Sequence, residues 1–218
     1  MKWHWIRELF PLSVLAIITV STLALLPGLP ESIPRHFALD GTPDAFMTKQ
    51  TYAYFIILVS AGLYVLLTFI PFIDPFWKRI QPKYGLLLLF RDIALGFFLF
   101  LHILSLMAAH SGSLDLRTMG IGFGLLFILL GNYLPKLPRN WFFGIRVPWT
   151  LASEEVWKRT HRLGGLLFVL AGIAIVVLSL AGLMPALAIG LPTVPLMVVV
   201  FVYPYLLYRR LQKESPEL

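Results

Sequence analysis

Long apolar runs separated by short polar segments make up most of this chain. Six of these runs are apolar on every side of a helix and reach about 20 residues, the length that crosses a membrane at 1.5 Å per residue. They lie near residues 9–26, 52–73, 86–109, 117–134, 162–184 and 186–208. The pattern predicts an all-α polytopic membrane protein, a bundle of about six transmembrane helices.

The composition agrees with a lipid environment. Hydrophobic residues make up 58% of the chain and charged residues only 13%, whereas about a quarter of a soluble domain is charged. The net charge of +7 does not indicate nucleic-acid binding, because the basic residues lie at the ends of the apolar runs. Cysteine is absent, which excludes disulfides, thiol catalysis and thiolate metal sites.

Lysine and arginine are distributed unevenly between the two sides of the predicted bundle. If the N-terminus is cytoplasmic, fourteen of the eighteen lie on the inner side and three on the outer side. Cytoplasmic loops carry such an excess of positive charge. We therefore expect both termini to be cytoplasmic, together with the polar loop at residues 131–165.

The first outer loop, at residues 27–51, has a composition typical of a folded segment. Its four prolines and its Asp40-Gly41 pair favour turns. Four apolar side chains offer contacts within the loop or to the bundle. They are Ile33, Phe37, Phe46 and Met47. We expect a compact, structured extracellular loop.

The inner loop at residues 131–165 is the longest polar interruption, with six of the Lys and Arg residues and three of the six Trp. Pro135 and Pro138 should end the helix before it. Thr150 or Ser153 is suited to cap the helix after it. In the simplest interpretation the loop is an interfacial turn, which its aromatic rings anchor and whose arginines meet lipid phosphates.

Arg146 fits that interpretation less well, because it stands between Ile145 and Val147, away from the basic ends of the apolar runs. A guanidinium in an apolar context does not lose its charge and needs an anionic partner. The candidate partners are carboxylates or a bound ligand. The carboxylates are those of Glu154, Glu155 and Asp92.

The third apolar run contains the polar residues Arg91, Asp92 and His102. Arg91 lies about one turn inside the cytoplasmic end, where it can extend to the surface while Asp92 pairs with it locally. His102 follows eleven residues later, which places it on nearly the same helical face. Either a structural polar stripe facing the bundle or a proton path agrees with this pattern. Asn132 is a candidate for a hydrogen bond between helices.

No sequence pattern indicates catalysis. The five histidines are scattered, without the spacing of a metal site, and GxSxG, P-loop and GxGxxG patterns are absent. We expect a protein that is not an enzyme, with no catalytic residues, no metal and no cofactor.

The inner loop resembles the signature of the SdpI family of bacterial membrane proteins. The shared pattern is a Gly-Asn, then Asn…Gly-Ile-Arg-Thr-Pro-Trp-Thr-Leu, then an acidic residue and Val-Trp. Val147 departs from it, because Thr is common there. The matching positions, with the nearby His161, are Gly131, Asn132, Asn140, Gly144, Ile145, Arg146, Pro148, Trp149, Thr150, Leu151, Glu154 or Glu155, Val156 and Trp157.

The first outer loop independently resembles the small DUF1648-type module that often precedes this signature. The resemblance divides the chain into the first two spans with their outer loop, at residues 1–73, and an SdpI-like four-span region at 74–218. The residues that carry the outer resemblance are Leu29, Pro30, Ile33, Pro34, His36, Phe37, Gly41, Pro43 and Asp44.

The resemblance implies a multi-pass protein of a bacterial plasma membrane that gives the producing cell immunity to a secreted antimicrobial peptide toxin. Phe37, Asp40, Asp44 and Phe46 would meet the toxin outside. The inner loop would support or signal, as in family members that recruit a repressor to the membrane. Membrane lipids are the other expected partners.

Two other functions agree with the sequence. In one, the protein is a small transporter or efflux protein for a peptide or lipid-like substrate, and its in-span polar groups line the path. In the other, it is an enzyme acting on lipid headgroups through Arg146 and Glu155, although no nucleophile or metal set accompanies them.

Overall fold

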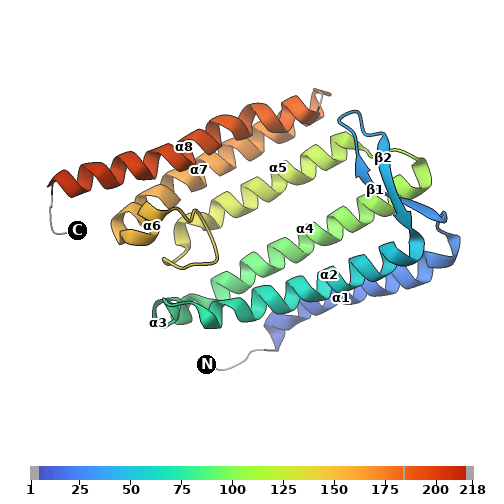
Figure 1. Cartoon of the computed structure of the whole chain (residues 1–218), viewed down its shortest axis with the longest axis horizontal. Coiled ribbons are helices and arrows are strands. Elements are labelled where there is room, and N and C mark those ends of the chain that lie inside the picture. Colours follow the sequence, from blue (N-terminus) through green and yellow to red (C-terminus); the bar gives the residue numbers. More distant parts are fainter. Residues whose placement is uncertain (1–4, 184, 215–218) are drawn as a thin grey trace.

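The computed structural model describes residues 5–183 and 185–214. Within them, six helices are long and apolar enough to cross a membrane, and they lie side by side along one axis (Figure 1). They are α1 (Ile6–Leu25), α2 (Lys49–Phe69), α4 (Tyr84–Ser111), α5 (Leu116–Tyr133), α7 (Glu154–Leu180) and α8 (Pro185–Glu214). The six-span all-α prediction is confirmed.

Short elements connect these helices. Proline is the first or second residue of five of them, where its missing amide donor costs nothing. The connecting elements are the 3₁₀ turns η1 (Leu26–Gly28), η2 (Ile70–Ile73), η3 (Gln81–Lys83) and η4 (Leu134–Lys136), and the short helices α3 (Trp77–Ile80) and α6 (Pro148–Ala152). The predicted fifth span at 162–184 begins earlier, because Ser153 caps α7 and accepts a hydrogen bond from the Val156 amide. Residue 184 lies outside the described residues.

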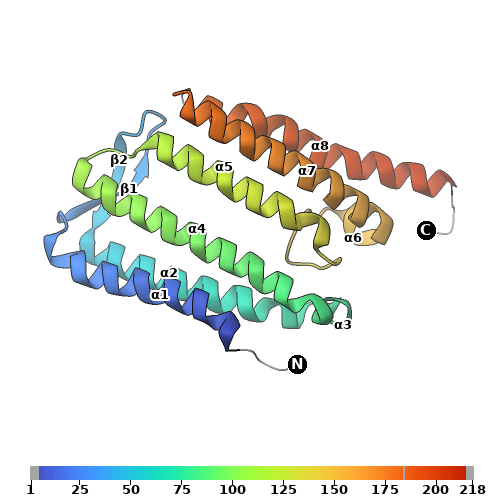
Figure 2. The same cartoon turned by 180° about the vertical axis from the view of Figure 1, so that it is seen from behind.

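The helices pack in two groups of three, α1–α2–α4 and α5–α7–α8, and α4 and α5 lie next to each other (Figure 2). Val14, Ile56 and Leu95 belong to the core of the first group. Trp157 and Ala171 belong to the second core, which α4 also joins through residues such as Phe90.

Glycines bring α5 and α7 into close contact. A Cβ atom added to Gly124 would lie 2.7 Å from the Gly172 carbonyl oxygen, and one added to Gly131 would lie 2.7 Å from that of Gly165. Small residues permit such approach between membrane helices, where dispersion contacts drive association.

The first outer loop forms an antiparallel hairpin of β1 (Ser32–Phe37) and β2 (Pro43–Thr48). Gly41 takes a positive φ of 84° in its turn, and the Leu114 amide donates to the Gly41 carbonyl at 3.0 Å. Ile33 is fully buried in the core of the first group. The compact loop predicted from the sequence is therefore present, although the sequence reasoning did not predict its strands.

The hairpin and the inner loop lie at opposite ends of the bundle (Figure 1). The described part of α1 begins, and that of α8 ends, at the end that carries α6. Placement of that end in the cytoplasm rests on the Lys and Arg distribution and stays a prediction. The division of the chain at residue 73 also stays a prediction.

Candidate functional site

The loop between α5 and α7 folds around the buried side chain of Asn140. Its amide nitrogen donates to the carbonyls of Pro138, at 2.9 Å, and Phe143, at 3.0 Å. Its side-chain oxygen accepts from the amides of Phe142, at 2.9 Å, and Phe143, at 2.6 Å. Both N–H groups and both acceptor positions are therefore used, so this side chain holds the turn and has nothing left for a ligand.

Thr150 closes the next part of the loop. Its hydroxyl accepts from the Val147 amide at 3.0 Å and lies 2.8 Å from the Ile145 carbonyl and 2.9 Å from that of Val147. Pro148 begins α6, and the Trp149 ring meets the Tyr205 ring of α8 edge-on with their centroids 5.0 Å apart. These contacts fix the short α6 helix against the bundle.

His161 joins α7 to the loop. Its Nδ1 lies 2.8 Å from the Trp157 carbonyl, a partner that fixes the proton on Nδ1, and its Nε2 accepts from the Ile145 amide at 3.0 Å. Its ring stacks on Trp157, whose Nε1 donates to the Leu137 carbonyl at 2.9 Å. Gly144 has a φ of 99°, and a Cβ there would collide with the His161 ring.

Asp74, which the sequence reasoning missed, ties this loop to the connection between α2 and α3. Its carboxylate is buried and accepts from the amides of Trp141 and Phe76, both at 2.7 Å. The signal in the sequence was an Asp-Pro pair just before a short helix, which favours capping. Asp74 and the signature residues Asn140, Thr150 and His161 thus build a rigid loop rather than an open reaction site.

Arg146 is exposed, and its Nη1 donates to the Trp141 carbonyl at 2.7 Å. The expected pairing with Glu154, Glu155 or Asp92 is wrong. The reason is the extended backbone, in which alternate side chains point to opposite sides. Ile145 and Val147 are buried, and Arg146 points away from both.

The carboxylates predicted for Arg146 have other partners. Glu154 lies within 4 Å of three cations, Arg79 at 3.4 Å, Arg139 at 3.5 Å and Lys158 at 3.8 Å. Glu155 pairs with Arg159 at 2.6 Å. Except for Arg139, whose side chain is only 12% exposed, these side chains are about half exposed, so their pairs add little stability. Arg146 and the half-exposed Trp141 form what we call the exposed face of the inner loop.

Arg91 is fully buried, so the prediction that it extends to the membrane surface is wrong. Its Nη1 donates to Glu8 of α1 at 2.9 Å and to the Thr68 hydroxyl at 3.1 Å. Its Nε donates to Asp92 at 2.9 Å, so the local pairing with Asp92 is present. The sequence reasoning did not identify Glu8 as a partner, because a single acidic residue beside Arg7 in the first turn of α1 is common at the start of a helix.

His102 faces the same helices as Arg91. Its Nδ1 lies 2.9 Å from the Tyr52 hydroxyl on α2, and its Nε2 lies 3.0 Å from the Ser21 hydroxyl on α1. The predicted polar stripe toward the bundle is therefore present, and a proton path along it stays a prediction. Asn132 is exposed on α5, so its expected place between helices is wrong.

The outer hairpin carries the remaining candidate residues. His36 Nδ1 lies 2.6 Å from the Asp44 carboxylate. Asp40 accepts from the hydroxyl and the amide of Thr42, which lowers the pKa of that carboxyl. Pro34 and Pro43 lie within the strands, and the register is irregular between Pro34 and His36. This irregularity bends the edge of the hairpin.

A pocket of about 470 Å³ lies between the hairpin and the first turns of α5 and α8. Arg35, Phe37, Leu39 and Leu116 are among the residues that line it. Leu39 is 73% exposed and Phe46 is 50% exposed. The hairpin therefore presents apolar side chains outside the bundle and beside a cationic one, a surface typical of partner binding.

Two families match separate parts of the chain. The SdpI/YfhL protein family matches residues 136–207, and the domain of unknown function DUF1648 matches residues 14–61. Immunity protein SdpI of Bacillus subtilis (strain 168) is 29% identical over 175 residues, which are 79% of this chain and 81% of that protein. The chain is therefore similar to the SdpI/YfhL protein family over residues 136–207, and to this immunity protein over most of its length. No solved structure matches significantly.

The two matches coincide with the two polar parts of this chain. The SdpI/YfhL match takes in most of the inner loop, with α7 and much of α8. The DUF1648 match takes in the hairpin and more than half of each of α1 and α2. With its six membrane-length helices, the chain is a multi-pass bacterial membrane protein. Within the described residues, no group of three His, Cys, Asp or Glu is placed to hold a metal ion.

Proposed function

We propose that this protein is an integral membrane immunity protein, which protects the cell that makes it against a secreted antimicrobial peptide toxin. The observation that carries the proposal is the similarity to an immunity protein over about four-fifths of each chain. That similarity extends over more residues than either family match alone, so it is not confined to one of the two matched segments. The direct test is survival of a toxin-sensitive host that expresses the chain.

The hairpin is our candidate for toxin recognition. It lies at the end of the bundle opposite the basic inner loop (Figure 1), so a peptide that arrives from outside meets it first. The exposed Leu39 and Phe46 offer apolar contact, and Arg35 lines the adjacent pocket. Replacement of residues 32–49 by a Gly/Ser linker should remove protection. Full protection by that variant would rule out recognition through the hairpin.

The inner loop is our candidate for signalling, by recruitment of a repressor protein to the membrane. Support comes from its rigid backbone, which presents Arg146 and Trp141 together at the surface. Arg146→Ala should abolish recruitment of a fluorescently tagged repressor to the membrane without lowering the level of the membrane protein. A repressor that still moves to the membrane with this variant would exclude Arg146 from the interface.

A small transporter is the second candidate, which the charged cluster of Glu8, Arg91 and Asp92 favours. Buried ionisable groups in membrane helices often mark a transport path. Flux of a labelled peptide into liposomes that Asp92→Asn abolishes would favour transport. Protection without any flux would favour immunity.

A further inference from the structure

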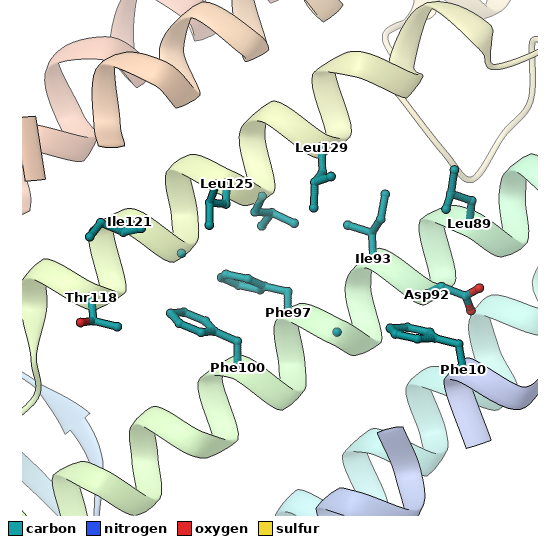
Figure 3. Close-up of a pocket in the computed structure, with 13 residues that line it drawn as sticks. Phe10, Leu89, Asp92, Ile93, Phe97, Phe100, Thr118, Ile121, Leu125 and Leu129 are labelled. Carbon is teal, nitrogen blue, oxygen red and sulfur yellow. The ribbon is translucent and has the colours of Figure 1, made fainter. Parts of the chain in front are cut away.

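A second pocket opens between α4 and α5, where the two groups of helices meet (Figure 3). Its volume is about 490 Å³, which lies within the range of ligand sites. Phe97 and Phe100 extend from α4 toward α5, and Leu125 and Leu129 face them. Leu125 is 51% exposed, so the pocket is open on the side of the bundle, where membrane lipid would surround it.

The wall of this pocket is apolar apart from two side chains. Thr118 lies at one end, and Asp92 lies beside Phe10 at the other (Figure 3). From Leu89 to Phe100 the pocket follows twelve residues of α4, a rise of about 16 Å at 1.5 Å per residue. It is therefore about half as long as the hydrocarbon core of a bilayer is thick. A fitting ligand is long and apolar, with one polar group near Asp92.

The charge around Asp92 is not balanced. Within the described residues, Arg91 is the only cation that pairs with Glu8 or with Asp92, so two carboxylates share one guanidinium. Glu8 is buried and also accepts from the Tyr64 hydroxyl at 2.9 Å. The side chain of Asp92 is 22% exposed and lines the pocket. The surplus negative charge thus faces the pocket, where low polarity strengthens its attraction for a cation.

We propose that the pocket between α4 and α5 binds an apolar, membrane-inserted peptide segment whose basic side chain pairs with Asp92. This inference rests on the proposed function, because it identifies the bound segment as part of the toxin and the place of capture as the membrane. A phospholipid fits less well, because its phosphate would meet the carboxylate of Asp92, whereas the basic side chain of a peptide would meet an opposite charge.

The test uses the full chain in phosphatidylcholine nanodiscs and two synthetic helical peptides of Leu and Ala. One peptide carries a single Lys and the other a Gln at the same position. Because the chain has no Cys, Ser111→Cys provides a unique site for a fluorophore, and the peptides carry an acceptor dye. Energy transfer then reports binding. We expect the Lys peptide to bind about 10-fold more tightly than the Gln peptide, equivalent to 1.4 kcal/mol.

Four variants of the labelled chain make the measurement specific. Asp92→Asn should remove the preference for Lys, and Asp92→Glu should keep it. Leu125→Trp should fill the pocket and weaken binding of both peptides. Leu166→Trp places the same ring at a comparably exposed position on α7 and should change nothing. Equal affinity of the wild type for the two peptides, or an unchanged Lys preference in Asp92→Asn, would overturn the proposal.

Two other results would also overturn it. In the first, neither peptide binds, and native mass spectrometry detects a phospholipid that Leu125→Trp displaces. The pocket would then be a lipid site. In the second, Leu125→Trp protects a toxin-sensitive host fully. The pocket would then have no part in immunity, and the immunity proposal itself would be unaffected. If the wild type itself fails to protect, the immunity proposal fails, whereas the peptide measurement still decides what the pocket binds.

Discussion

Glu8 of α1 and Arg91 of α4 form a buried ion pair with 2.9 Å between Oε2 and Nη1. The two residues lie 83 positions apart in the sequence, so the pair fixes the first span to the third. Asp92, Thr68 and Tyr64 complete its hydrogen bonds. Removal of Glu8 would leave Nη1 of the buried Arg91 without its carboxylate, with Asp92 as its one remaining acidic partner among the described residues, and breaking a buried pair from one side is costly.

Glu8→Ala should therefore lower the free energy of unfolding by about 3 kcal/mol, the lower end of the cost of breaking a buried pair. The measurement is equilibrium unfolding in detergent. The matched control is Glu31→Ala, because the highly exposed Glu31 pairs with Lys49 at the same 2.9 Å. That change should cost less than about 1 kcal/mol. Equal losses in the two variants would contradict a structural role for the buried pair.

Asn140→Ala should open the inner loop locally. The change leaves the amides of Phe142 and Phe143 without their acceptor, and each unsatisfied buried group costs about 1–3 kcal/mol. Hydrogen exchange at these two amides should accelerate by at least about 10-fold. Arg146→Ala serves as the control and should leave both exchange rates unchanged. Fast exchange in Arg146→Ala would mean that Arg146 also stabilises the loop. A loss of function in this variant would then reflect an unfolded loop as well as a lost contact with a partner.

Gly124→Ala should weaken the contact between α5 and α7. The added Cβ would lie 2.6 Å from a Val176 methyl and 2.7 Å from the Gly172 carbonyl oxygen, so the helices must separate. We expect a loss of about 1–3 kcal/mol, as for overpacked cores. Gly62→Ala on α2 is the control, because no atom lies within 4 Å of its Cβ position, and Ala favours the helix by up to about 1 kcal/mol. A destabilised Gly62→Ala would disprove this account of the glycines.

The fold could largely be predicted from the sequence, whereas the partners of the polar residues could not. The spans follow from apolar length alone. The strands of the hairpin did not stand out, because Pro34 lies inside β1, where proline usually argues against a strand. The pairing of Arg91 is a tertiary contact between helices that are far apart in the sequence, and hydrophobic periodicity does not predict such a contact.

The inner loop shows the same limit. Sequence reasoning singled out Asn140, Thr150 and His161 but could not show that their hydrogen bonds are made within the loop. It offered a carboxylate or a bound ligand as the partner of Arg146 and could not place the side chain, because the side on which an extended residue points depends on packing. Only the structure separates the residues that build this loop from those that are free to bind.

The lethal dose of the toxin for a sensitive host tests the immunity proposal most directly. Expression of the wild type should raise that dose by at least about 10-fold. The double variant Leu39→Ser and Phe46→Ser, at equal protein level, should lose most of the gain, because apolar contacts dominate peptide recognition. Ile73→Ser is the control, since Ile73 is as exposed as Leu39 but lies at the opposite end of the bundle, and it should keep the gain. No rise in lethal dose with the wild type would contradict the account.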